Sequence, residues 1–474
     1  MGVTLVGFIV SIILARLLAP DDFGLIAIVV VFVILTDIIV DCGFGSALIQ
    51  KESVDNLDFS TVFYFTTVLS IMLGAVLFLA APAIAAFYYN PQLIPIIRWM
   101  SFRKIFNGIG KAQSAYAYRN MLFKRFFWSS AAATLVSAVV AIVMAYSGYG
   151  IWALVAQYLI SSGVTTVVLW FTIKWRPDPA FSWQRLKVLY SFGWKLMVSI
   201  LIATFYTQLR SLIIGKLYTT EDLAYYTRGK NFPELITDNF TNTIANVLFP
   251  AVSQKQKDTE AMKMMVRQSM TTTAYLVWPA MAGLAVCAEP LVLLLLTEKW
   301  LPAVPFLQIA CFVNALTPIQ YANSQVIKAM GRSDIFLKLE IVKRSIAVVI
   351  LLLIMHQGVW IIALSSILTG TIFLVLNTVP TARLIKYRFT EQMADILPSL
   401  GLSALMAAAV YPIHFLELSA VPTLCLQAAT GIVVYVLLSL LFKVKSFYFI
   451  LNTVRQFLLS KEKAILPDDI KTIS

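Results

Sequence analysis

The sequence predicts an all-α, polytopic membrane protein of about 14 transmembrane helices, arranged as two parallel six-helix repeats followed by a C-terminal helix hairpin. Three observations support this fold class. Hydrophobic residues make up 59% of the 474 residues and charged residues only 13%, about half the share found in soluble domains. Basic residues are concentrated in alternate connections between apolar runs. Two stretches of sequence 200 residues apart resemble each other.

Apolar segments long enough to cross the roughly 30 Å hydrocarbon core follow one another along the chain, which excludes a soluble protein. The fourth and eighth segments are the least apolar. We expect spans near residues 2–19, 23–42, 61–87, 93–117, 126–147, 150–173, 193–214, 222–249, 267–296, 303–329, 336–355, 358–380, 394–413 and 421–442. The four cysteines show no paired spacing, so we expect neither a disulfide framework nor a metal site, and no motif indicates a cofactor.

The net charge of +13 could indicate binding to nucleic acid, but its distribution argues against this class of partner. One set of connections carries nearly all the bases, whereas the other set is short and contains essentially one cation, Lys299. Because Lys and Arg are retained on the cytoplasmic side, we expect the basic set and both termini to be cytoplasmic. The bases of that set are Lys51, Arg119, Lys124, Arg125, Lys174, Arg176, Arg185, Lys187, Lys255, Lys257, Lys263, Arg332, Arg383, Lys386, Arg388, Lys443 and Lys445.

The repeated unit joins one apolar helix to the next. Residues 15–24 read ARLLAPDDFG and residues 215–224 read GKLYTTEDLA, each with a base, a leucine and an acidic pair at the same spacing. A duplicated bundle of an even number of spans predicts two parallel lobes with a site between them. We expect an N-terminal lobe at 1–175, a cytoplasmic linker with an interfacial helix at 176–192, a C-terminal lobe at 193–385, an accessory helix pair at 386–443 and a cytoplasmic tail at 444–474.

Ionisable residues within a span cost about 2.5–3.5 kcal/mol on insertion scales and therefore indicate function or internal pairing. In the fourth span Arg98, Lys104 and Lys111 follow steps of three and four with Ser101 and Gly108, so they share one helical face. No acidic residue lies three or four positions away on that helix. The alternative for Arg98 and Lys111 is that they extend to opposite membrane interfaces.

Further bases lie in the second half of the chain. Arg210 and Arg228 have no acidic residue three or four positions away, which makes them candidates for binding an anion. Lys230 is spaced by four from Glu234, so a structural ion pair on one helix face is an equal alternative. These bases together predict a central cavity richer in cations than in anions.

Four more candidates remain open between two interpretations. Arg16 and Lys216 occupy matching positions of the repeat, where they could bind substrate together with Asp22 or form ordinary pairs with Asp22 and Asp222. Asp37 and Asp41 share a helix face at a spacing of four and could bind a proton or sodium ion. Asp41 could equally cap the helix end before Gly43, and we favour a structural role for this pair.

Five stretches taken together resemble the lipopolysaccharide and exopolysaccharide flippase family, of the colanic-acid-exporter type, within the multidrug/oligosaccharidyl-lipid/polysaccharide superfamily. They are residues 14–25, 41–51, 148–154, 225–228 and 296–302. The resemblance implies two six-helix lobes with two extra helices. It also implies that undecaprenyl-pyrophosphate-linked oligosaccharide crosses the bacterial inner membrane. Arg16 and Asp22 sit where related lipid II flippases carry a cavity Arg and Asp, and Arg228 matches the Arg of a Tyr-Tyr-Thr-Arg motif.

The expected function is therefore a flippase for lipid-linked repeat units in O-antigen or exopolysaccharide biosynthesis, working by alternating access and not as an enzyme. Expected partners are the lipid-linked glycan, membrane lipids and the polymerase and chain-length-control proteins of the same pathway. One alternative is a multidrug exporter of the same superfamily, but such a pump would favour acidic cavity residues. Another is a polysaccharide polymerase, which would present a larger outer loop carrying catalytic acids or bases.

Overall fold

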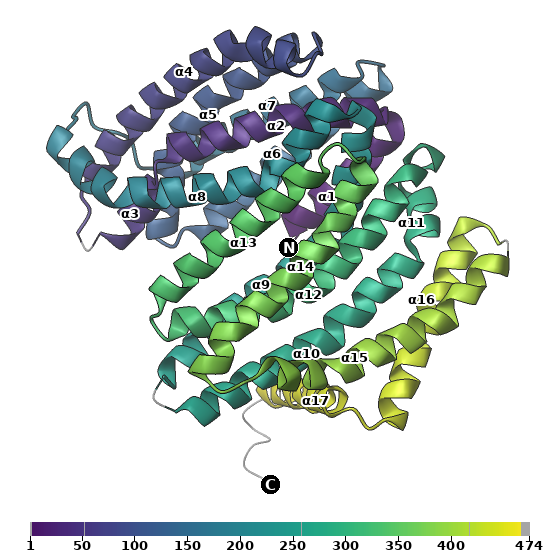
Figure 1. Ribbon diagram of the computed structural model, residues 1–474. Coiled ribbons are helices and arrows are strands. Elements are labelled where there is room, and N and C mark those ends of the chain that lie inside the picture. The colour runs from purple at the N-terminus through teal and green to yellow at the C-terminus, as the bar shows by residue number, and fades with distance from the viewer. Residues whose placement is uncertain (1, 52, 257, 417, 466–474) are drawn as a thin grey trace. The chain divides into compact units, whose positions relative to one another are not determined.

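The computed structural model describes residues 2–51, 53–256, 258–416 and 418–465, which form helices joined by short connections and contain no strand (Figure 1). The helices are α1 (Gly2–Leu17), α2 (Pro20–Asp41), α3 (Phe44–Gln50), α4 (Asn56–Phe87), α5 (Leu93–Arg119), α6 (Phe123–Tyr146), α7 (Ile151–Thr172), α8 (Trp183–Leu217), α9 (Thr220–Gln254), α10 (Thr259–Val286), α11 (Ala288–Leu295), η1 (Glu298–Ala303), α12 (Val304–Ala329), α13 (Ser333–Ile354), α14 (Val359–Leu384), α15 (Phe389–Val410), η2 (Tyr411–Leu416), α16 (Ala420–Leu441) and α17 (Lys445–Ile465).

The described helices confirm an all-α, multi-pass membrane protein. Nine of them are long and apolar enough to cross a membrane, and α10 with α11, bent by 69° at their junction, makes up to ten. Helix α1 is shorter than these spans, and α5, α9 and α13 are interrupted by charged residues. Adding those four helices to the ten reaches the expected 14, a number that stays a prediction.

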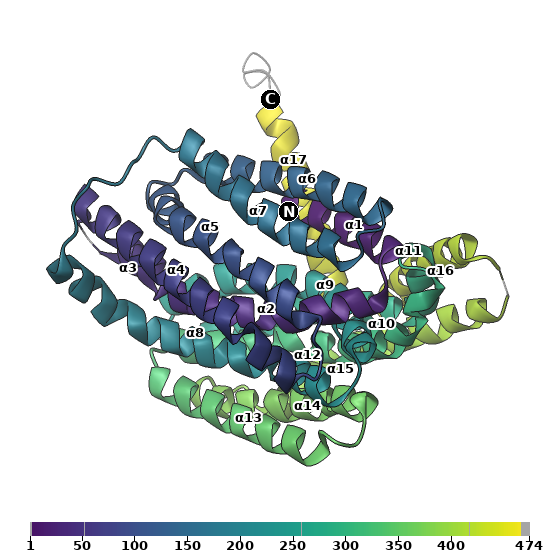
Figure 2. The same ribbon diagram turned by 90° about the horizontal axis from the view of Figure 1, so that it is seen from above.

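The chain divides into two compact units. Unit 1 comprises residues 1–227 with 295–299, and unit 2 comprises residues 228–294 with 300–474. In unit 1, α2 lies in the middle and packs against α4, α5, α7 and α8, while α6 packs on α7 and α1 packs on α6 (Figure 2). The apolar helix α2 is thus the element against which the charged helix α5 is placed.

The connection from α7 to α8 differs from the expected linker. We expected an interfacial helix within 176–192, but Trp183 opens α8, which continues without a separate short helix to Leu217. Ser182 caps α8 because its side chain accepts a hydrogen bond from the backbone N–H of Arg185. Since α8 packs against α2, α3 and α4 in unit 1, the boundaries of two six-helix lobes remain a prediction.

Unit 2 is built around α10, which packs against α12 and α15; α14 covers α12, and α16 covers α15. Tyr275 of α10 and Tyr435 of α16 are held together by hydrogen bonds within an apolar cluster that includes Met406. The tail that we expected at 444–474 contains α17, which packs on α10 (Figure 1). Residues 466–474 lie outside the described residues.

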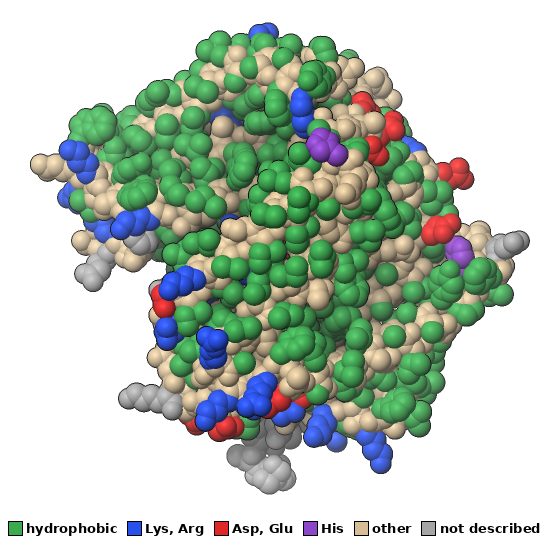
Figure 3. Space-filling view, in the orientation of Figure 1, with side chains coloured by type: hydrophobic (Ala, Val, Ile, Leu, Met, Phe, Trp, Pro, Cys, Tyr) green, Lys and Arg blue, Asp and Glu red, His purple; other side chains and the backbone are tan. Residues whose placement is uncertain are grey.

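The surface has the distribution of side chains that a membrane requires. Hydrophobic side chains cover most of the face shown in Figure 3, and basic and acidic side chains are concentrated toward its edges. Large apolar side chains are well exposed on several helices, for example Leu79 at 75% and Phe171 at 83%. An exposed apolar area of this extent is stable only where lipid, and not water, surrounds it.

The two copies of the repeated unit contact each other within unit 1. Gly24 at the start of α2 faces the backbone of Thr220 at the start of α9, and a Cβ at Gly24 would lie 1.8 Å from the Thr220 carbonyl oxygen. The Thr220 hydroxyl also hydrogen-bonds to the Asp21 carboxylate. The Gly at position 24 is therefore required by a close backbone approach and not by its dihedral angles.

We expect Gly24→Ala to destabilise the protein by about 1–3 kcal/mol, because the added methyl group overlaps backbone atoms that cannot move without separating the helices. Thermal unfolding in detergent, followed by size-exclusion chromatography, measures the change. Gly7→Ala is the matched control, since nothing lies within 4 Å of a Cβ at Gly7. Equal melting temperatures for the two variants would contradict the close approach.

Candidate functional site

The basic face of α5 meets the acidic face of α2. The Lys104 side chain has no exposed surface, and its Nζ lies 2.7 Å from Asp37 Oδ1. Nζ also donates a 2.5 Å hydrogen bond to the Val33 carbonyl oxygen, and Asn107 Nδ2 donates to the same Asp37 oxygen at 3.0 Å. A lysine that is fully buried within a membrane-spanning bundle is thereby neutralised by a partner on the neighbouring helix.

A second ion pair lies about one helical turn farther along α2 and two turns farther along α5. Lys111 Nζ lies 3.0 Å from Asp41 Oδ1, with both side chains about one-third exposed. Arg103 approaches Asp37 at 3.8 Å, donates to Ser162 Oγ on α7 at 2.7 Å, and lies over the Tyr158 ring. These contacts join α2, α5 and α7 into one polar cluster of three bases and two acids.

This pairing changes the interpretation of the sequence. Lys104 and Lys111 share one face of α5, as the spacing predicted, and meet acids of α2, so that bases and acids considered separately are partners across two helices. Arg98 does not lie on this face: it contacts Phe78 of α4. In this conformation Lys104 has no surface available to a ligand. The geometry thus favours a structural role for Lys104, while substrate binding by the other members and ion binding by Asp37 and Asp41 stay predictions.

Small residues allow α5 to lie this close to its neighbours. A Cβ at Gly108 would lie 1.9 Å from Ser70 Oγ, and Gly74 of α4 faces the Ser101 carbonyl and the Lys104 stem. Such close helix approach through Gly and Ser is typical of membrane proteins. It brings the Lys104 stem among tightly packed backbones, so that its ammonium group can extend only toward α2.

The two copies of the repeated unit, residues 15–24 and 215–224, share the same local backbone structure. Asp22 accepts a hydrogen bond from the Ala19 backbone N–H at 3.3 Å, and Asp222 accepts one from Thr219 at 3.3 Å. Lys216 does not form the pair with Asp222 that we had considered: its ammonium donates to the Phe87 carbonyl oxygen and lies 3.7 Å from the Tyr89 ring centroid.

Two further bases, Arg16 and Lys299, lie in or next to the first copy of the repeated unit. Lys299 donates to the backbone carbonyls of Arg16 and Leu18, at 2.8 and 2.5 Å, and so ties the end of α1 to the start of η1. The Arg16 side chain is exposed. Unit 1 therefore carries several cations around the junctions of α1 with α2 and of α8 with α9.

The remaining predicted bases lie on α8 and α9. Arg210 is half-buried on α8 in unit 1, whereas Arg228 and Lys230 belong to unit 2. Lys230 forms the expected ion pair with Glu234, at 3.1 Å. The Arg228 guanidinium lies 5.7 Å from the ring of Trp300, which is fully buried and holds the guanidinium by a cation–π contact.

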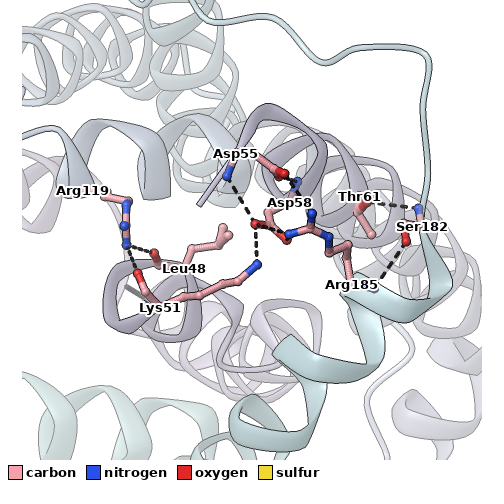
Figure 4. A network of polar contacts seen from close by, with 8 residues as sticks. All are labelled: Leu48, Lys51, Asp55, Asp58, Thr61, Arg119, Ser182 and Arg185. Atoms are coloured by element: carbon pink, nitrogen blue, oxygen red, sulfur yellow. Dashed lines mark hydrogen bonds and ion pairs between the residues drawn. The ribbon is translucent and has the colours of Figure 1, made fainter. Parts of the chain in front are cut away.

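A polar network that sequence reasoning missed ties α3, α4 and α8 together (Figure 4). Asp58 is fully buried and accepts hydrogen bonds from Lys51 at 2.5 Å and from Arg185 at 3.4 Å. Ser182 donates its backbone N–H to Thr61 Oγ1 at 3.2 Å. The sequence indicated Lys51 and Arg185 only as markers of the cytoplasmic side. Nothing local in the sequence indicates that Asp58, 127 positions before Arg185, is its partner.

Two neighbours extend this network. Arg119, at the end of α5, donates from Nη1 to the Leu48, Ile49 and Lys51 carbonyl oxygens and so caps the C-terminal end of α3. Asp55 accepts from the Asp58 backbone N–H and pairs with Arg185 at 3.0 Å. These two contacts, the backbone N–H first, lower the pKa of Asp55 below its usual value.

No group of His, Cys, Asp and Glu side chains within the described ranges has the arrangement of a metal site. The polar clusters are instead built from Lys, Arg and Asp. Such clusters suit helix positioning and contact with anions, because Arg and Lys are donors to phosphate and carboxylate oxygens.

Comparison with known proteins places this arrangement in a family. Residues 13–305 match the family described as Polysaccharide biosynthesis protein. The chain belongs to this family. This confirms the resemblance found in the sequence, since the matched residues include all five stretches and both copies of the repeated unit.

Two relatives show how far the similarity extends. The Lipopolysaccharide biosynthesis protein WzxC of Escherichia coli (strain K12) is 25% identical over 339 residues, covering 71% of this chain and 69% of the relative. The Succinoglycan biosynthesis transport protein ExoT of Rhizobium meliloti (strain 1021) is 30% identical over 314 residues, covering 66% of this chain and 63% of the relative. The match to ExoT thus spans less than two thirds of that protein.

Solved structures share the fold. The lipid II flippase MurJ, in an inward closed conformation, superposes with a TM-score of 0.77 at 15% identity, covering 93% of this chain and 96% of that chain. An inward-facing multidrug resistance MATE family transporter gives 0.57 at 16% identity, covering 80% and 95%. At these identities the likeness establishes the fold alone.

We expect Asp37→Asn and Lys104→Met each to lower stability by about 3–5 kcal/mol, because each leaves the other group buried without its counter-ion. The double variant Asp37→Asn/Lys104→Met should be destabilised by much less than the sum of the two single variants. Melting temperatures in detergent measure the coupling. Lys111→Met is the matched control and should cost far less, since the Lys111–Asp41 pair is partly exposed. Additive effects of the two single substitutions would contradict the pairing.

We expect Asp58→Asn to release the start of α8, because Arg185 and Lys51 would lose the anion on which both converge. Hydrogen–deuterium exchange should become faster in residues 176–190. Asp55→Asn removes a carboxylate that is about half exposed and should have a smaller effect. Unchanged exchange in Asp58→Asn would show that the linker is held by other contacts.

Proposed function

We propose that the chain is a flippase that carries undecaprenyl-pyrophosphate-linked oligosaccharide repeat units across the bacterial inner membrane for surface polysaccharide biosynthesis. The observation that carries this proposal is the match of residues 13–305 to the polysaccharide biosynthesis family on a fold shared with a lipid II flippase. WzxC and ExoT are both named for polysaccharide biosynthesis, and ExoT for transport. A transport role, and not catalysis, accounts for both similarities.

The proposed substrate contacts are made by bases outside the paired α2–α5 cluster. Arg16, Arg210 and Arg228 offer guanidinium groups whose fork of donors matches a pyrophosphate, and Lys216 adds a point charge. Asp22 shapes the turn that presents Arg16. Lys230, paired with Glu234, would support Arg228 by fixing the face of α9. The glycan would occupy the watery cavity while the lipid chain stays in the bilayer.

The α2–α5 cluster has a different part in this proposal. Lys104, Lys111 and Arg103 fix α5 on α2, so that unit 1 moves as one body during alternating access. Asp37 and Asp41 would couple transport to an ion gradient if a proton or sodium ion displaced a lysine from either carboxylate. We place both termini in the cytoplasm. The polymerase and chain-length-control proteins would act on the flipped product at the other side of the membrane.

A multidrug exporter is the second candidate, because the fold also resembles a MATE transporter. The family match and the higher TM-score of the lipid II flippase favour the polysaccharide substrate. Asp37 and Asp41 of α2 are both paired with lysines, which leaves them poorly placed to bind a cationic drug. An anionic cargo fits these observations better.

We expect Arg228→Ala to abolish surface polysaccharide while folded protein persists in the membrane, because the cargo pyrophosphate loses a bidentate donor. A leaflet-resolved assay of the lipid-linked intermediate in a deletion strain should show its accumulation on the cytoplasmic face. Arg332→Ala is the matched control, since Arg332 lies in a connection and pairs only locally with Asp334.

The same assay separates the alternatives. Accumulation on the outer face in the deletion strain would indicate a polymerisation defect, and normal leaflet distribution with altered drug resistance would indicate an exporter. Normal export by Arg228→Ala would remove Arg228 from the substrate site while leaving the flippase function to be judged by the deletion strain.

A further inference from the structure

Arg98 differs from Arg103, Lys104 and Lys111 of α5 because it lines an open groove instead of meeting an acid. The groove has a volume of about 440 Å³ and is lined by Phe78 of α4 and by Ile94, Pro95, Arg98, Trp99 and Phe102 of α5. All of these residues belong to unit 1. Apart from Arg98, every lining side chain is apolar.

The groove lies on the side of α5 that points away from α2. Lys104 and Lys111 face α2, whereas Trp99 and Phe102 are 54% and 46% exposed on the other side of the helix. On α4, Val76 and Leu79 next to Phe78 are 60% and 75% exposed. A surface this apolar on a membrane-spanning helix pair faces lipid.

The charge of Arg98 has no anion among the residues that the structure describes. Its guanidinium carbon lies 4.9 Å from the centroid of the Phe78 ring, and its Nε is buried without a hydrogen-bond partner. A cation–π contact neutralises only part of the charge, and an unsatisfied buried donor is destabilising. The groove therefore carries a cation whose charge is only partly neutralised by its neighbours in the structure.

The position along the helix matches the depth of lipid phosphates. Arg98 is five residues beyond the first residue of α5, or about 8 Å along the axis. Helical side chains point back toward the N-terminus, which carries the guanidinium toward Ile94 and Pro95 and hence toward the interface. The polar interfacial layer is about 5–7 Å thick on each side of the bilayer, and tryptophans such as Trp99 are typical of it.

We propose that this groove binds the headgroup phosphate of a bilayer phospholipid of net negative charge. The Arg98 guanidinium donates hydrogen bonds to the phosphate oxygens, and the glycerol and first acyl segments lie on Phe78, Trp99 and Phe102. The groove contains none of the bases proposed above to bind the cargo, Arg16, Arg210, Lys216 and Arg228. A bound lipid of this kind fixes the height of the α4–α5 pair in the membrane.

Photolabelling of the full chain in nanodiscs tests this proposal. One probe is phosphatidylglycerol with a diazirine near its headgroup, and the other is a diacylglycerol with the same diazirine and no phosphate. We expect the phosphatidylglycerol probe to label peptides that contain Phe78 and residues 94–102, and the diacylglycerol to label them about tenfold less. Equal labelling by both probes overturns the proposal. Because this comparison uses the unsubstituted protein, it does not depend on the folding of a variant.

Two substitutions sharpen the test. Arg98→Gln should reduce labelling of the groove by phosphatidylglycerol about tenfold, which is the effect of losing a charge-assisted hydrogen bond. Arg125→Gln removes an exposed arginine at the start of α6 and is the matched control, which should leave groove labelling unchanged. Labelling that persists in Arg98→Gln overturns the assignment of the phosphate to Arg98.

A competition arm distinguishes the lipid source. Undecaprenyl pyrophosphate, added at the concentration of the protein, should not displace phosphatidylglycerol present in large excess. Displacement at that concentration would assign the groove to the carrier lipid and overturn the proposed occupant. This outcome is separate from the flippase proposal, which is judged by the leaflet distribution of the intermediate.

Discussion

A lysine with no exposed surface inside a membrane-spanning bundle is stable only if an anion is held against it, and much of unit 1 is arranged to meet this condition. Asp37 supplies the anion, Val33 adds a carbonyl oxygen, and Asn107 orients the carboxylate. The contact fixes both the rotation and the height of α5 relative to α2. Since α2 also packs against α4, α7 and α8, the ion pair determines how these helices meet.

The close contact of the repeated units adds a second constraint at the ends of the same helices. Asp22 and Asp222 make equivalent caps, and the Gly24–Thr220 approach brings the two copies together. Duplication explains why the copies share their local structure. Their surroundings differ, because Lys216 lies against Phe87 and Tyr89, whereas the carbonyl oxygen of Arg16 accepts from Lys299. The two copies of the repeated unit thus share their local backbone structure, while Arg16 and Lys216 have different surroundings.

The sequence predicted the helices well because their signal is local. Apolar length and alternating charge located the spans, and the spacing of Lys104 and Lys111 placed these two bases on one side of a helix. Arg98, predicted on the same side, lines a groove elsewhere on α5. The sequence did not predict that Lys104 pairs with Asp37, since the partners are 67 residues apart and the pairing depends on helix rotation. The Asp58 network was not predicted for the same reason, because Asp58 and Arg185 are far apart in the sequence. Helix α17 was missed because its mixture of bases and apolar residues also suits a tail.

Comparison of Arg98 with Lys104 shows how one helix separates two uses of positive charge. The residues are six positions apart, yet Lys104 points into the bundle and meets an acid, while Arg98 lines a groove with only aromatic and aliphatic neighbours. A charge neutralised within the protein stabilises packing but attracts nothing from outside. A charge without an internal anion attracts one from its surroundings, and on a lipid-facing surface the available anion is a headgroup phosphate. Spacing along the helix alone therefore identifies a basic face but not the partner of each base.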